Sequence, residues 1–122
     1  MPNAAQTYEA VGMQTASPRK LEASLLLKSA SRLQAVHDSW DHSRSELDDA
    51  LYFNRRLWSL LIAAVTSAEN PLPHPIRQNV ANLGLFVLNH TITLMADPKP
   101  EKLGSLININ REIAAGLLGR AA

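Results

Sequence analysis

The sequence contains no cysteine and few aromatic residues, and its opposite charges nearly cancel. Among its 122 residues, 5% are aromatic and the formal net charge is +1. Without thiols, the chain can form no disulfide scaffold, thiolate zinc site or cysteine nucleophile, and it fits a reducing cytoplasm. Because the net charge is close to zero, no strong electrostatic attraction draws the protein to nucleic acid or to an acidic membrane.

The sequence also lacks long apolar runs and the usual patterns of catalysis. Its strongest apolar stretches, residues 60–65 and 83–88, are far shorter than the ~20 residues needed to span a bilayer. Residues 1–10 have neither the basic nor the apolar part of a secretion signal. No catalytic triad order, paired-carboxylate signature or glycine-rich phosphate loop is present. We therefore expect a cytoplasmic protein that is not an enzyme and has no cofactor and no membrane partner.

What the sequence does contain is a series of helical segments separated by proline-rich breaks. Ser17 followed by Pro18 is typical of a helix start. The capping-box pattern Ser43-x-x-Glu46 predicts a second start. We expect a short helical or mobile segment over residues 1–16. Four main helices should follow it, over residues 18–40, 43–68, 75–96 and 100–118. Four helices with short connections predict an all-α antiparallel bundle, a single domain over residues 17–122.

The apolar residues of the predicted helices form stripes that mark buried faces. On the first helix, Leu27 falls off the face shared by Leu25, Leu26, Leu33, Val36 and Trp40. The second helix has two stripes: Leu47, Leu51, Trp58, Leu61 and Val65, and then Phe53, Leu57, Leu60 and Ala64. The third helix also has two: Ile76, Val80, Leu83, Val87 and Leu94, and then Leu85, Leu88, Ile92 and Met95. Apolar residues on two sides of the second helix predict that it packs against two neighbours.

Three residues have expected structural roles. We expect Trp58 to be a core residue. Gly84 interrupts the third helix at a cost of roughly 1 kcal/mol against alanine, which indicates close contact with a neighbouring helix. Asn110 lies in the middle of the apolar face of the last helix, and a buried asparagine needs hydrogen-bond partners. It fits an architectural role, like a polar residue that fixes register in a coiled coil, better than a role in binding a ligand.

The polar faces offer two weak candidates for a site. The grouping of His37, Asp38, Asp41 and His42 matches no strong metal-ligand spacing and is typical of solvated surface. Arg55 and Arg56 form a small basic spot on the second helix. A nucleic-acid interface usually needs a basic stripe with interleaved aromatic residues, so direct binding of RNA or DNA is not expected.

Phe86 is an outlier on the third helix. It falls within a polar arc that contains Asn82 and Asn89, with His90 one turn further on. Together with Leu27 on the first helix, an exposed Phe86 fits a groove for a partner helix. The alternative is that residues 1–16 fold back and cover Phe86 with Tyr8 and Val11. The sequence leaves both interpretations open.

Several short strings resemble the bacterial flagellar FlaF family. They are, in order from Tyr8, Ser17-Pro18-Arg19, Glu22, Leu25-Leu26, Ala30, Leu33, Arg55-Arg56-Leu57-Trp58, Asn70-Pro71-Leu72-Pro73, Leu83-Gly84-Leu85-Phe86-Val87, Leu106, Ile109-Asn110-Arg111-Glu112-Ile113 and Gly116-Leu117. Their order and spacing, more than any one string, carry the resemblance. One departure is Phe86, where tryptophan is expected in many relatives, and the aromatic character is kept.

The resemblance implies a cytoplasmic protein needed to build the flagellar filament. Proteins of this kind are associated with flagellin production and export and act alongside the translational regulator FlbT. We therefore expect a chaperone that binds an amphipathic segment of flagellin in an apolar groove. The alternative is a post-transcriptional regulator that acts with FlbT or on flagellin mRNA. A third interpretation is a helical adaptor or homodimer, so the oligomeric state stays open.

Overall fold

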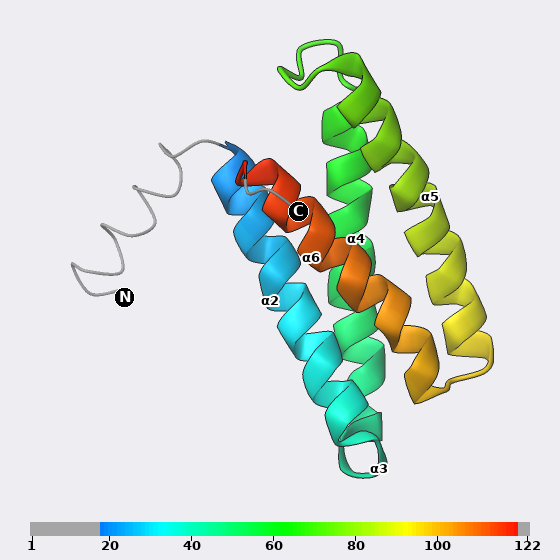
Figure 1. Ribbon diagram of the computed structural model, residues 1–122. Coiled ribbons are helices and arrows are strands. Elements are labelled where there is room, and N and C mark those ends of the chain that lie inside the picture. Colours follow the sequence, from blue (N-terminus) through cyan, green and yellow to red (C-terminus); the bar gives the residue numbers. More distant parts are fainter. Residues whose placement is uncertain (1–17, 120–122) are drawn as a thin grey trace, which may run out of the picture.

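The computed structural model describes residues 18–119, which form an antiparallel bundle of four main helices (Figure 1). The main helices are α2 (Pro18–Asp38), α4 (Leu47–Thr66), α5 (His74–Ala96) and α6 (Leu103–Leu117). The short elements are α3 (Trp40–Ser43), η1 (Arg44–Glu46) and η2 (Pro100–Lys102). The predicted all-α fold is confirmed. The expectations for residues 1–16 and for Ser17 lie outside the described residues.

The four helices are arranged as two closely packed pairs. α2 packs along α6, α4 packs along α5, and α2 also contacts α4. α5 and α6 meet near the turn that joins them and then diverge (Figure 1). No helix in the described part of the chain is long and apolar enough to cross a membrane.

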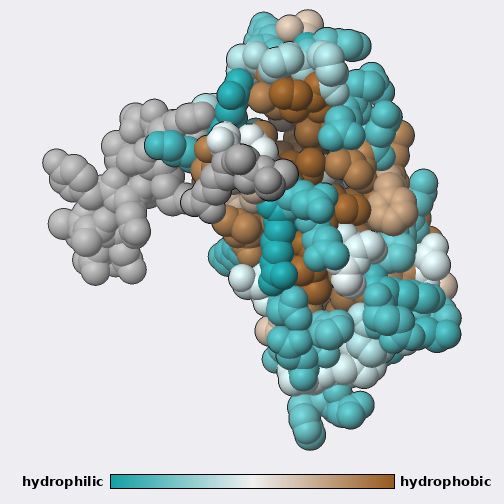
Figure 2. Space-filling model, viewed as in Figure 1, coloured by the Kyte–Doolittle hydropathy of each residue, from teal (hydrophilic) through white to brown (hydrophobic). Residues whose placement is uncertain are grey.

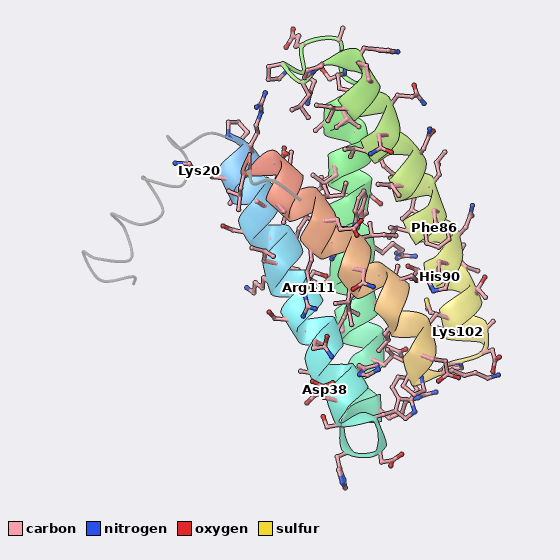
Figure 3. All side chains as sticks on the ribbon, viewed as in Figure 1. Lys20, Asp38, Phe86, His90, Lys102 and Arg111 are labelled. Atoms are coloured by element: carbon pink, nitrogen blue, oxygen red, sulfur yellow. The ribbon has the colours of Figure 1, made fainter. Side chains whose placement is uncertain are left out.

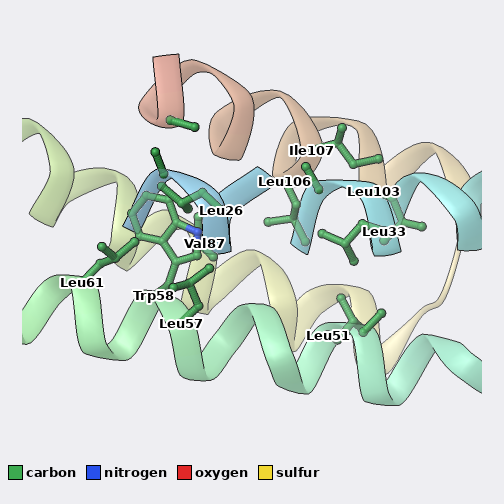
Figure 4. Packing of buried hydrophobic residues seen from close by; sticks show 14 of the residues in the cluster. Leu26, Leu33, Leu51, Leu57, Trp58, Leu61, Val87, Leu103, Leu106 and Ile107 are labelled. Atoms are coloured by element: carbon green, nitrogen blue, oxygen red, sulfur yellow. The ribbon is translucent and has the colours of Figure 1, made fainter. Parts of the chain in front are cut away.

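The core lies between α4 on one side and α2 and α6 on the other (Figure 4). The first predicted stripe of α4, which includes Trp58, is buried along its whole length. Its partners across the core include Leu26 and Leu33 of α2, Val87 of α5 and Leu106 of α6. Burial of these side chains is the main stabilising contribution to the bundle.

The predicted capping box at Ser43 is wrong. α4 begins at Leu47, and residues 40–46 form the single turns α3 and η1. The Ser43 side chain caps neither element. Its hydroxyl donates instead to the main-chain oxygen of Ser39 at 2.8 Å and to that of Val36 at 3.3 Å. The Ser43 hydroxyl therefore satisfies main-chain oxygens at the C-terminal end of α2 and does not cap the N-terminus of α4.

The second apolar stripes of α4 and α5 are only partly buried. α4 does pack between two neighbours, α2 and α5, but Leu60 is 64% exposed. On α5, Leu85, Ile92 and Met95 are exposed as well. α6 contacts the opposite side of α4 through Asn110, and no described helix covers the side of α4 that carries Leu60. The pattern of apolar residues in a helix therefore does not show whether another helix packs on that face.

Candidate functional site

Trp58 and Asn110 anchor a polar network inside the core. The indole Nε1 of Trp58 donates to Oδ1 of Asn110 at 2.8 Å. An indole nitrogen can only donate, so this bond fixes which way the Asn110 amide points. The amide nitrogen of Asn110 then donates to Oδ1 of Asn54 at 2.7 Å and to the main-chain oxygen of Leu26 at 3.4 Å. Ser29 donates to the same Asn54 oxygen at 2.8 Å.

This network links α2, α4 and α6. Asn110 is fully buried, as expected from the sequence, and so is Trp58. Asn54 was missed, because nothing in its local sequence shows that its partners lie 25 and 56 residues away. Its Nδ2 atom is buried and has no hydrogen-bond partner among the described residues. The bonds of the other network atoms hold three helices together in one register.

Gly84 sets the distance between α5 and α4. A Cβ atom at this position would lie 2.5 Å from Cγ1 of Ile62 and 3.2 Å from Cε3 of Trp58. Separations this short are repulsive, so with any larger residue the Ile62 side chain or the two helices would have to shift. The close contact expected at Gly84 is therefore present, and it holds α5 against α4.

The side of α4 that faces away from α6 is an open surface with two grooves. By helix geometry, Arg56 lies about 160° around α4 from the buried Trp58. One groove, with a volume of about 440 Å³, runs between α4 and Leu25 and Arg32 of α2. The other, of about 550 Å³, runs between α4 and Leu88 and Ile92 of α5. We call these the first and second grooves, and together the outer face of α4.

A ridge on α4 separates the two grooves. Tyr52, Arg56 and Leu60 line both grooves and follow one another at intervals of four residues. Residues at this spacing form a continuous row on a helix surface. The remaining lining residues on α4 are Asp49, Phe53 and Leu57 in the first groove, and Arg55 and Ser59 in the second. The floor of the outer face is thus mostly apolar, and its charged groups are mostly cationic.

The cations of the first groove stand over an aromatic ring. The guanidinium carbon of Arg32 lies 5.1 Å from the centre of the Phe53 ring, and Nζ of Lys28 lies 5.7 Å from it. Both distances are within the range of cation–π attraction. Phe53 and Arg32 both line the first groove, and Lys28 lies beside it over the same ring.

The second groove repeats this arrangement. Arg55 and Arg56 lie 5.8 Å and 6.0 Å from the centre of the exposed Tyr52 ring. Among residues 18–119, neither these arginines nor the two cations of the first groove pair with a carboxylate. Asp49 is the only acidic residue that lines either groove in the described part of the chain. Among the described residues, these four cations therefore lie over aromatic rings and make no direct ion pair with a carboxylate.

Phe86 and Leu27, which the sequence placed in one groove, lie apart. α2 packs along α6 and α4, whereas α5 packs along α4, and α2 and α5 are not neighbours in the bundle. Leu27 is 37% exposed on α2 and Phe86 is 45% exposed on α5, and neither lines the two grooves. The structure therefore does not bring Leu27 and Phe86 together in either groove, and their part in binding a partner stays a prediction.

Phe86 belongs instead to the side of α5 that faces α6 (Figure 3). Its ring stacks on that of His90 at a centroid distance of 5.3 Å. Nε2 of His90 lies 2.8 Å from the main-chain oxygen of Lys102 and 3.2 Å from Oγ of Ser105, so it joins α5 to the start of α6. On this side of the molecule, apolar side chains gather between the diverging helices (Figure 2). The two remaining polar candidates on α5, Asn82 and Asn89, are exposed.

Two carboxyl groups on α2, those of Glu22 and Asp38, have shifted pKa values. Nδ1 of His37 lies 3.0 Å from Asp38, and this hydrogen bond lowers the pKa of the Asp38 carboxyl. Burial raises the pKa of Glu22. Within residues 18–119, no three histidine or acidic side chains come together as metal ligands would.

Comparison with known proteins adds one finding. No curated protein and no solved structure matches the chain. Residues 4–117 match the family described as flagellar protein FlaF. This match covers nearly the whole sequence and includes both grooves and the buried network. The chain belongs to the FlaF family of flagellar proteins.

Proposed function

We propose that this protein binds flagellin in the cytoplasm as a chaperone and promotes its synthesis and export. Membership of the FlaF family supplies the link to the flagellum. One structural observation carries the proposal: the outer face of α4 exposes Leu60 and Ile92, each at 64%, beside two grooves. Apolar side chains gathered in this way are typical of a binding surface.

The outer face has the features of a site for an amphipathic helix. In helix-in-groove recognition, a partner inserts apolar residues from one face of a helix between the helices of its receptor. The segments of flagellin that assemble in the filament are amphipathic, and before export they must be prevented from polymerising. If such a segment bound along α4, its apolar face would be shielded from other flagellin molecules.

Calorimetric titration with purified flagellin monomer tests this proposal. We expect saturable binding that weakens at higher salt but is not abolished, because apolar contacts carry most of it. The double variant Leu60→Ala, Ile92→Ala should bind several-fold more weakly. Leu27→Ala is the matched control, since Leu27 is also an exposed leucine but lies outside both grooves. Absence of flagellin binding would refute the chaperone role.

The Phe86 side of α5 is the second candidate surface for flagellin. Phe86→Ala removes an exposed ring that stacks on His90, so we expect little loss of thermal stability. If Phe86→Ala weakens binding and the Leu60, Ile92 variant does not, flagellin docks between α5 and α6 and the outer face is not its site.

The alternative function is post-transcriptional control of flagellin expression together with FlbT. The four cations that make no direct ion pair among residues 18–119 favour it, because they could contact the phosphates of a messenger RNA. Phosphate contacts make binding steeply dependent on salt. The same titration with FlbT, and with flagellin mRNA at two salt concentrations, separates this function from the first.

A further inference from the structure

We propose that the outer face of α4 takes a single amphipathic helix that carries acidic residues on both sides of its apolar stripe. This inference shares one assumption with the proposed function, namely that a segment of another protein binds the outer face of α4. It names the chemistry that the surface recognises, which family membership does not specify.

The ridge on α4 fits one helix rather than two. Tyr52, Arg56 and Leu60 rise between the two grooves at a spacing of four residues. When helices pack, such a row of one helix fits between two rows of the other. A single helix lying over the ridge would therefore place apolar side chains in both grooves at once.

The charges then fall on both flanks of the docked helix. Lys28 and Arg32 project from α2 beside the first groove, and Arg55 projects from α4 into the second. Arginine and lysine side chains lose much rotamer freedom when they form an ion pair. Because aromatic rings already hold these cations, part of that cost is met before the partner arrives. Carboxylates on both flanks of the partner would find cations already positioned.

A second copy of this chain fits the surface poorly. In a twofold dimer, the same patch of each subunit faces its counterpart. The four cations of one copy would then meet the same four of the other, with Asp49 as the one acidic lining residue to offset them. Repulsion between like charges disfavours this dimer.

RNA also fits less well than an acidic helix. Bases stack on exposed aromatic rings, but here arginines occupy the faces of Tyr52, and Phe53 is half-buried. Much of the rest of the surface is leucine and isoleucine, which match an apolar stripe better than a sugar–phosphate chain.

Two designed helical peptides test the charge preference. They share leucines at all apolar positions and differ only in carrying glutamate or lysine at every flanking position. Binding to the full-length protein is measured by fluorescence anisotropy. We expect the acidic peptide to bind roughly tenfold more tightly, since each exposed ion pair contributes a small factor and several form together. The double variant Arg32→Glu, Arg55→Glu should remove or reverse the preference.

The matched control is the double variant Lys20→Glu, Arg111→Glu. It makes the same change in net charge at two exposed cations that lie outside both grooves (Figure 3). The preference for the acidic peptide should be unchanged. Unfolding followed by circular dichroism should show that both double variants fold, because all four residues are exposed.

The outcomes separate this inference from the proposed function. Equal affinity for both peptides would overturn the inference, even if flagellin binds. A clear preference for the acidic peptide would support it, even if flagellin fails to bind and the chaperone role falls. Tighter binding of a single-stranded RNA or of anionic phospholipid vesicles, lost in the Arg32, Arg55 variant, would also overturn it. So would concentration-dependent dimerisation through this face, measured by sedimentation.

Discussion

The side chains of Trp58 and Asn110, which are 52 residues apart in the sequence, meet in the centre of the bundle through a hydrogen bond of 2.8 Å. Both are fully buried. Because the Asn110 amide also donates to Asn54, its two polar groups serve two different positions on α4. Asn110 thus fixes how far along α4 the last helix lies.

Replacing Asn110 by alanine should destabilise the fold. The indole nitrogen of Trp58 would stay buried without an acceptor, and Asn54 would lose a donor. A buried polar group left unpaired costs about 1–3 kcal/mol, so we expect a loss of roughly 2–3 kcal/mol in the free energy of unfolding. Urea denaturation measures it. Asn108→Ala, on the exposed side of the same helix, is the control and should change stability by less than about 0.5 kcal/mol. Equal losses in the two variants would show that the network contributes nothing.

Truncating two large side chains of α4 should change the stability of the fold by very different amounts. Trp58 is fully buried and Leu60 is 64% exposed, although the sequence predicted that both would pack. Trp58→Ala should cost roughly 3–5 kcal/mol, the usual range for removing a buried aromatic residue. Leu60→Ala should change stability by less than about 0.5 kcal/mol. Thermal unfolding of the two variants checks this, and a large loss for Leu60→Ala would mean that the outer face of α4 is covered by part of the chain itself.

Gly84→Ala should be destabilising for a reason that a second substitution can partly remove. Alanine favours a helix over glycine by about 1 kcal/mol, but its Cβ would lie 2.5 Å from Cγ1 of Ile62. Overpacking of this kind costs about 1–3 kcal/mol, so we expect a net loss. In an Ile62→Ala background the contacts with Ile62 disappear and only the 3.2 Å approach to Cε3 of Trp58 remains, so the same Gly84→Ala change should cost clearly less. A double-mutant cycle measures this difference, and additive effects would contradict the close approach of α5 to α4.

Asp97 should contribute stability that depends on pH. Nζ of Lys102 lies 3.1 Å from its carboxylate, and this hydrogen bond, with the charges of Lys102 and Lys99, lowers the pKa of Asp97. A carboxyl whose pKa is lower in the folded state stabilises the fold above its ordinary pKa. That contribution is lost as the pH falls through the lowered pKa.

Titration of Asp97 by nuclear magnetic resonance measures the shift directly. Lys102→Met should raise its pKa toward the ordinary value for aspartate, whereas Lys28→Met, far from this turn, should leave it unchanged. In thermal unfolding, Asp97→Asn should be less stable than the parent near neutral pH, and the difference should shrink in acid. A constant difference across the pH range would show that the pair has no role in stability.

The sequence predicted the helices well and the uncovered surface poorly. Helical periodicity and proline breaks depend on local geometry, so four helices and the burial of Trp58 could be inferred. Whether Leu60 and Ile92 are covered depends on where a helix distant in the sequence packs. The same holds for Asn54, whose partners are known only once α2 and α6 are in place. Arg55 and Arg56 were recognised as a basic spot, but their aromatic support and their place beside a groove appear only in three dimensions.

The buried network has a consequence for how the protein is made. Its side chains come from residues 29, 54, 58 and 110, and α6 leaves the ribosome after α2, α4 and α5. Until α6 emerges, Trp58 has no acceptor for its indole nitrogen and α2 lacks the helix along which it packs most extensively. The core of the nascent bundle therefore stays incomplete until α6 has left the ribosome, however early α2, α4 and α5 are made.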